Sequence, residues 1–125
     1  MIGGNLPVQA GNGVNDLAAR PVLAAIAGNA SFYLGNGNNL VTLGATSSIG
    51  GVLNVVTGNG DNTLTLAASQ TYVVNAIFGS GNDTLVLGDG ASTPTLTGYV
   101  NAGGGSNTPT VNSGTPAPDL TLIGF

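Results

Sequence analysis

Apolar and polar residues alternate along short segments of this chain, and glycine-rich phrases separate these segments. In residues 63–66 and 84–87, every second residue is leucine. A period of two places successive side chains on opposite faces of a β-strand, and threonine favours that conformation. The pattern therefore predicts a strand with one apolar face directly after each glycine-rich phrase.

A second set of strands is predicted directly before the phrases. The residues three and five positions before the first glycine of each phrase are mostly apolar and should face inward. The residues two positions before it should face outward, although three of them are apolar. The inward positions are Val8, Phe32, Val55, Ala76, Val100 and Leu6, Ala30, Leu53, Val74, Gly98, and the apolar outward positions are Tyr33, Val56 and Ile77.

The glycine-rich phrases recur at a nearly constant interval. Successive phrases start 24, 23, 21 and 24 residues apart, and such a period is typical of a stacked repeat in which each copy forms one layer. Glycine suits the tight corner between the two strands of a layer. The sequence predicts an all-β protein, a right-handed parallel β-solenoid of about five coils with 21–24 residues each. The phrases are 11–15, 35–39, 58–62, 79–83 and 103–107.

The fifth position of the phrase carries an amide in four copies and a carboxylate in one. Stacked layers are about 4.8 Å apart, so these side chains can hydrogen bond to the corner backbone and to the copies in adjacent layers. We expect them to form an internal ladder. Its members are Asn15, Asn39, Asn62, Asp83 and Asn107.

Two segments depart from the repeat. The alanine-rich segment 17–27 allows a short helix, capped by Asn15 or Asp16 and ended near Gly28, with an irregular segment as the alternative. We expect the solenoid to occupy 1–111 and a C-terminal arm to occupy 112–125. The arm is rich in Pro, Gly and Ser at first and then contains a predicted strand at Leu120–Ile123.

Charged residues are rare, and their scarcity excludes several functions. The chain of 125 residues has five aspartates, one arginine and no Lys, Glu, His, Cys or Trp. A single cation argues against nucleic acid or an anionic membrane as a partner, and no apolar run is long enough for membrane insertion. Without His, Lys, Cys or Glu, we expect no enzyme activity and no catalytic residues.

One stretch is similar to a known repeat. Residues 79–90 (GSGNDTLVLGDG), and in part 58–66, resemble the calcium-binding nonapeptide of RTX proteins, the type I-secreted bacterial toxins and adhesins. The resemblance implies a bacterial extracellular protein with an export signal in its C-terminus, in agreement with a start that lacks signal-peptide features. It also implies Asp61, Asp83 and Asp89 as calcium ligands. The aspartate position is Asn in the other phrases, so we favour no cofactor and structural corner roles for these aspartates.

The leading functional hypothesis is a self-assembling subunit of an extracellular filament or fibre. A solenoid exposes unpaired backbone groups and apolar core at both ends, and this chain offers no charged cap for them. Copies could stack head to tail, the C-terminal arm could donate its strand to a neighbour, or both could occur. The predicted assembly residues are Tyr33, Val56, Ile77, Leu120, Leu122 and Phe125.

Two alternatives remain. One is a calcium-binding RTX-type module of an adhesin or toxin. The other is an ice-binding solenoid that uses two outward threonine columns, which Leu40 and Val86 interrupt. These columns contain Thr63, Thr84, Thr108 and Thr42, Thr65, Thr110.

Overall fold

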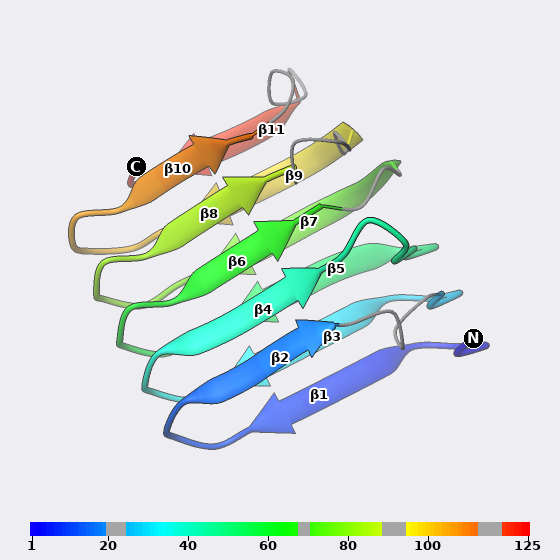
Figure 1. Ribbon diagram of the computed structural model, residues 1–125, viewed down its shortest axis with the longest axis horizontal. Helices are drawn as coiled ribbons and strands as arrows, with labels where there is room; N and C mark the ends of the chain where they lie inside the picture. Colours follow the sequence, from blue (N-terminus) through cyan, green and yellow to red (C-terminus); the bar gives the residue numbers. More distant parts are fainter. Residues whose placement is uncertain (20–24, 68–70, 89–94, 113–118) are drawn as a thin grey trace.

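The chain folds as a stack of strand pairs, each pair joined by a corner (Figure 1). The structure, a computed structural model, describes residues 1–19, 25–67, 71–88, 95–112 and 119–125. All pairings between its strands are parallel, as expected for a β-solenoid in which the same strand recurs in every layer.

The odd-numbered strands form the first sheet, which has six strands in the order β1-β3-β5-β7-β9-β11. Each of these strands leads into a corner, except β11, which is the last strand of the chain. The strands are β1 (Leu6–Ala10), β3 (Ala30–Leu34), β5 (Val52–Val56), β7 (Thr71–Ile77), β9 (Thr95–Asn101) and β11 (Leu120–Ile123).

The even-numbered strands form the second sheet, which has five strands in the order β10-β8-β6-β4-β2. Each follows a corner and carries the alternating pattern seen in the sequence, for example buried leucines between half-buried threonines in β6. The strands are β2 (Asn15–Ala19), β4 (Asn39–Leu43), β6 (Thr63–Leu66), β8 (Thr84–Leu87) and β10 (Thr108–Val111).

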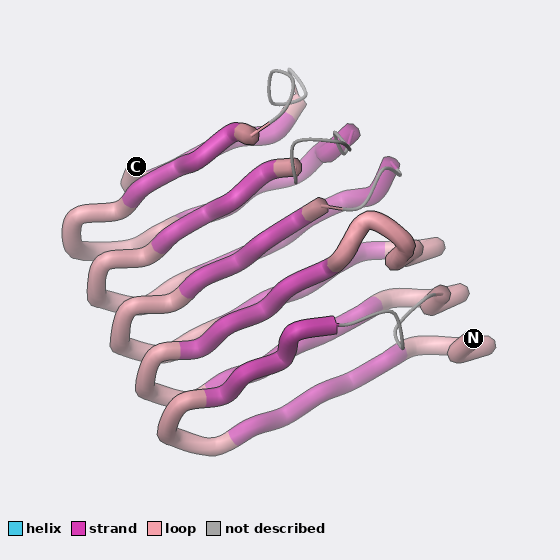
Figure 2. Tube along the Cα trace, in the orientation of Figure 1, coloured by secondary structure: helices cyan, strands magenta, loops and turns pink. Residues whose placement is uncertain are grey.

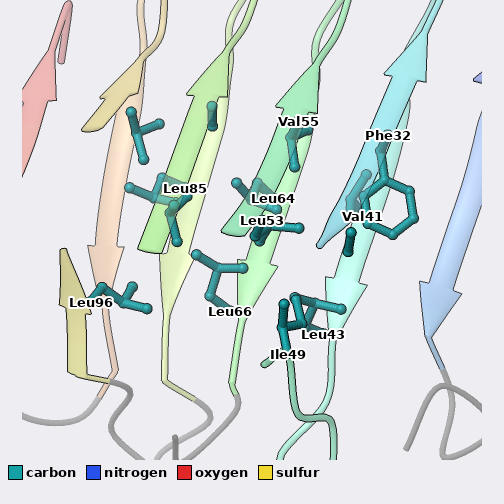
Figure 3. Close-up of a cluster of buried hydrophobic side chains, with 14 of the residues drawn as sticks. Phe32, Val41, Leu43, Ile49, Leu53, Val55, Leu64, Leu66, Leu85 and Leu96 are labelled. Carbon is teal, nitrogen blue, oxygen red and sulfur yellow. The ribbon is translucent and has the colours of Figure 1, made fainter. Parts of the chain in front are cut away.

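The core lies between the two sheets, and aligned columns of apolar side chains fill it (Figure 3). Val41, Leu64 and Leu85 form one column of the second sheet, and they face a column of the first sheet that contains Phe32 and Val55. All five are 2% exposed or less. Because the register aligns equivalent residues, burial recurs in every inner layer with the same spacing.

Two sequence predictions need correction. The described residues contain no helix (Figure 2), and residues 17–19 of the predicted helix belong to β2 instead. Pairing with β4 therefore decides the conformation there, whereas residues 20–24 of that prediction lie outside the described part. Four steps join the five strands of the second sheet, so the stack has about four full turns, slightly fewer than the five coils expected.

The C-terminal strand is present with the predicted bounds, but it pairs with its own chain. β11 lies parallel to β9 and extends the first sheet by one strand. No helix long and apolar enough to cross a membrane occurs among the described residues.

The glycine at the third position of each phrase occupies a backbone conformation that other residues rarely adopt. Gly13, Gly37 and Gly60 have φ angles of 118°, 116° and 125°. A Cβ on Gly37 would also collide with the carbonyl of Gly13 in the preceding layer, whereas a Cβ on Gly13 would meet nothing, because no layer precedes it. Glycine is thus required twice over in the inner corners, by backbone conformation and by the closeness of the layers.

These two glycines allow the two effects to be separated. We expect Gly13→Ala to lower the free energy of unfolding by about 1–2 kcal/mol, which is the cost of a positive φ. Gly37→Ala adds a steric collision with backbone and should cost about 1–3 kcal/mol more. Urea denaturation of the two variants measures the difference, and equal losses would show that layer spacing does not constrain the corner.

Candidate functional site

A ladder of hydrogen bonds runs through the corners at the fifth position of the phrase. Nδ2 of Asn15 donates to Oδ1 of Asn39 over 2.7 Å, and Asn39 donates in the same way to Asn62 over 2.8 Å. Asn62 then donates to Oδ1 of Asp83 over 2.9 Å. At the last step, the backbone N–H of Asp83 donates to Oδ1 of Asn107 over 2.8 Å. All five predicted ladder residues are therefore connected.

The same amides also hold their own corners closed. Nδ2 of Asn39 donates to the carbonyls of Gly35 and Gly37, over 3.0 and 2.9 Å. Asn15 and Asn62 make the equivalent pair of bonds. Asn15, Asn39 and Asn62 thus share the two hydrogens of Nδ2 among two corner carbonyls and the ladder residue of the next layer, which explains why an amide serves this position well.

Asp83 is the exception in the ladder, because a carboxylate has no N–H to donate. Its Oδ1 accepts hydrogen bonds from the backbone N–H and from Nδ2 of Asn62, each 2.9 Å long. Its Oδ2 is buried and has no hydrogen-bond partner. Burial raises the pKa of Asp83 above its ordinary value of 3.8; the two bonds from Asn62 oppose this, and the charge of Asp61 adds to it.

The structure contains further ladders that the sequence analysis missed. At the second phrase position, Oδ1 of Asn12 accepts the backbone N–H of Asn36 over 2.9 Å. At the fourth position, Oδ1 of Asn38 accepts the N–H of Asp61 over 2.9 Å. The signal was visible, because both positions carry Asn or Asp in several copies. The other bonds at these two positions are Asn36 to Asn59, Asn59 to Ser80, Asp61 to Asn82 and Asn82 to Ser106.

The three aspartates implied as calcium ligands have different surroundings. Asp83 is buried in the ladder, and Oδ1 of the exposed Asp61 accepts the backbone N–H of Asn82 over 2.7 Å. Asp89 lies outside the described residues. Within the described part of the chain, no three His, Cys, Asp or Glu side chains are grouped so that they could hold a metal ion.

Both ends of the stack expose part of the apolar core. At the N-terminal end, the inward side chains of β1 and β2 are only partly buried, although they pack against the core. At the C-terminal end, the inward side chains of β11 and the side chain of Phe125 are also only partly buried. The predicted assembly residues Leu120, Leu122 and Phe125 therefore pack against the core. The partly buried residues are Ile2, Leu6, Val8, Ala10, Leu17, Leu120, Leu122 and Phe125.

Proline occurs on two of the four terminal strands. Leu6 of β1 donates its N–H toward β3, and Thr108 of β10 donates its N–H toward β8. Successive N–H groups of a strand point in opposite directions, so Pro7 and Pro109 stand where a donor would face the free edge. Proline at an edge weakens pairing with another strand. Each of these two edges therefore lacks one donor but keeps its other backbone groups.

The three apolar residues predicted at outward positions form a lateral column on the outer face of the first sheet. Tyr33, Val56 and Ile77 pair in register on β3, β5 and β7 and are 47%, 36% and 42% exposed. Ile123 of β11 continues this column beyond Asn101 and is 46% exposed.

The predicted threonine columns lie on the outer face of the second sheet. Their members align in register across β4, β6, β8 and β10, and Leu40 and Val86 interrupt them as expected. All are half-buried except Thr108, which is exposed.

No family model matches the chain, and comparison with curated proteins and with solved structures gives no match. Functional inference therefore depends on the geometry of the ladder, the two ends and the outer faces.

Asp83 should make stability depend on pH. The folded state holds its proton more tightly than the unfolded state, so this contribution is fully present below about pH 4 and is lost as the pH rises through the raised pKa. In Asp83→Asn, Nδ2 can donate to the corner carbonyls as Asn62 does. We expect this variant to be more stable than the parent at pH 7, by about 1–3 kcal/mol, with a flatter pH profile.

Denaturation curves at pH 3.5 and pH 7 provide the measurement, and Asp61→Asn is the matched control. Asp61 accepts a backbone N–H from the adjacent layer but is exposed, so its replacement should leave most of the pH dependence in place. A loss of stability in Asp83→Asn at pH 7 would contradict the role assigned to the unpaired oxygen.

Proposed function

We propose that this protein is a self-assembling structural subunit whose copies stack end to end into a filament. The observation that carries the proposal is that the same apolar columns, closed in every inner layer, are open at both ends of the stack. Leu17 begins the column that Val41, Leu64 and Leu85 continue, and the column ends at Pro109. A second copy placed in register would extend the column and remove the partly exposed residues from water.

Hydrogen bonding at the ends is complementary as well. The terminal strands pair on one side only, so their other side presents backbone donors and acceptors in the spacing of a parallel strand. The two ends differ from each other, which makes the contact heterologous, and repetition of such a contact gives an open polymer. Pro7 and Pro109 make the junction weaker than an inner layer by one donor each, so the polymer should depend on concentration.

We place the assembly outside a bacterial cell. Support for this location comes from the resemblance of residues 79–90 to the RTX nonapeptide. The near absence of charged side chains supports assembly instead, because copies with little charge repel one another weakly. The exposed column of Tyr33, Val56 and Ile77 would then provide lateral contacts between neighbouring filaments.

A calcium-binding RTX-type module is the competing function, and chelation separates the two. A roll held by calcium loses its structure in EDTA, because metal binding is part of its folding energy. A solenoid held by amide ladders keeps its circular dichroism spectrum and its polymers. Loss of both in EDTA would favour the calcium module.

Two apolar side chains of similar exposure distinguish end contacts from side contacts. Val111 of β10 is 40% exposed at the C-terminal end, and Ile77 is 42% exposed on the lateral face. We expect Val111→Asp to raise the critical concentration for polymers by more than about tenfold, because a charge would be buried at each junction. Ile77→Asp should leave filaments intact and reduce only their bundling.

Sedimentation and negative-stain electron microscopy of the parent and both variants, with and without EDTA, complete the test. A folded parent protein that stays monomeric up to millimolar concentration would contradict the proposal. Equal effects of Val111→Asp and Ile77→Asp on the critical concentration would contradict the proposed end-to-end geometry.

A further inference from the structure

The two sheets end at different layers, and this difference determines how a second copy can join. Among the described residues, the first sheet has six strands and the second has five, so the last layer contains β11 without a described counterpart in the second sheet. Suppose that β1 of the next copy paired with β11. Its β2 would then lie two strand spacings, about 9.6 Å, from β10 and leave a one-strand gap in the second sheet.

The gap disappears if β11 leaves its place. Both sheets then end with the layer formed by β9 and β10, and β1 and β2 of the next copy can pair with these strands together. Resting on the proposed end-to-end assembly, we infer that the receiving surface is the β9–β10 edge and that β1 of the incoming copy displaces β11. In this arrangement, β11 is a removable cap that competes with a second copy of the chain.

The residues of β11 match those of β1 column by column. Through the chain of pairings in the first sheet, Leu120 stands in the column that Leu6 begins, and Leu122 stands in the column of Val8. These are the inward positions of both strands, and all four side chains are partly buried against the core. β1 of another copy therefore brings an equivalent apolar face to the place that β11 occupies.

Gly124, the residue that follows β11, also occupies the next position of the amide ladder. In inner layers, Nδ2 of Asn39 or Asn62 donates to Oδ1 of the following ladder residue. Asn107 is the last ladder residue, and its Nδ2 donates instead to the carbonyl of Gly124 over 2.8 Å. When β11 leaves, Oδ1 of Asn15 in the next copy can accept this bond and continue the ladder without a break.

Replacement of β11 by β1 of the next copy adds no hydrogen bond to the first sheet. β1 carries Pro7 at the position where β11 has Thr121, so the incoming strand offers one N–H fewer to β9. The gain comes from the second sheet, where β2 of the next copy covers β10 and its exposed Val111. β11 should therefore persist in the monomer and leave only when a second copy arrives.

A reversible crosslink between β11 and β9 tests this inference. Thr121 and Tyr99 are paired residues on adjacent parallel strands, a spacing that a disulfide can bridge, and the chain has no other cysteine. The double variant Thr121→Cys/Tyr99→Cys should lose all polymer when oxidised and regain it on reduction with dithiothreitol. The matched control is Asn54→Cys/Asn75→Cys, which links β5 to β7 and should polymerise in both states.

Leu122→Ala supplies a second readout that needs no disulfide. Because it weakens the cap without changing β9 or β10, it should lower the critical concentration about tenfold. If β1 instead stacks on β11, the same substitution weakens the receiving surface and raises the critical concentration.

The outcomes separate the two proposals. A parent and an oxidised crosslinked variant that polymerise equally would overturn the displacement of β11 but leave end-to-end assembly in place. A parent that never polymerises would overturn both.

Discussion

The stack depends on the close approach of one layer's backbone to the next at the corners. Parallel hydrogen bonding sets this spacing along the strands, and the corners must follow it without the regular pattern of a sheet. Gly37 and Gly60 permit it because a Cβ at either position would collide with the carbonyl of the glycine one layer before. Asn39 and Asn62 then satisfy the corner carbonyls that strand pairing leaves over. The layers of Asn39 and Asn62 share both features, whereas the layer of Asp83 repeats only the close glycine contact, between Gly81 and Gly60.

The ladder links adjacent layers through hydrogen bonds, and Asp83 is the one member that cannot donate from its side chain. An amide both donates and accepts, so it links two layers and closes a corner at once. A carboxylate in the same place accepts from Asn62 but leaves Oδ2 buried and unpaired. An oxygen in place of the amide nitrogen thus removes the donor to the corner carbonyls, and burial raises the pKa of the carboxyl group that takes its place.

The incomplete burial of the core at the two ends of the solenoid follows from the same repetition of layers. In a solenoid, each inner layer is covered on both sides by a similar layer, whereas the first and last layers are covered on one side only. The partly buried apolar residues of the core accordingly lie at the two ends. At the C-terminal end, β11 covers β9 with inward leucines at the positions that correspond to those of β1. The carbonyl of Gly124 accepts a hydrogen bond from Nδ2 of Asn107. In the proposed filament, self-capping by β11 and the addition of a second copy would therefore compete for the same edge of β9.

The sequence by itself determined the period, the corner glycines, the inward columns and the fifth-position ladder, because each repeats at positions that a single layer geometry explains. It also placed the strand Leu120–Ile123 correctly. The partner of this strand was decided only by the tertiary structure, because any free parallel edge suits Leu120 and Leu122 equally well. The same holds for residues 17–19, where local helix preference gives way to pairing with β4. The repeat in the sequence determines the strands and the corner of each layer. The unequal number of strands in the two sheets depends on where the last strand pairs, which only the tertiary structure shows.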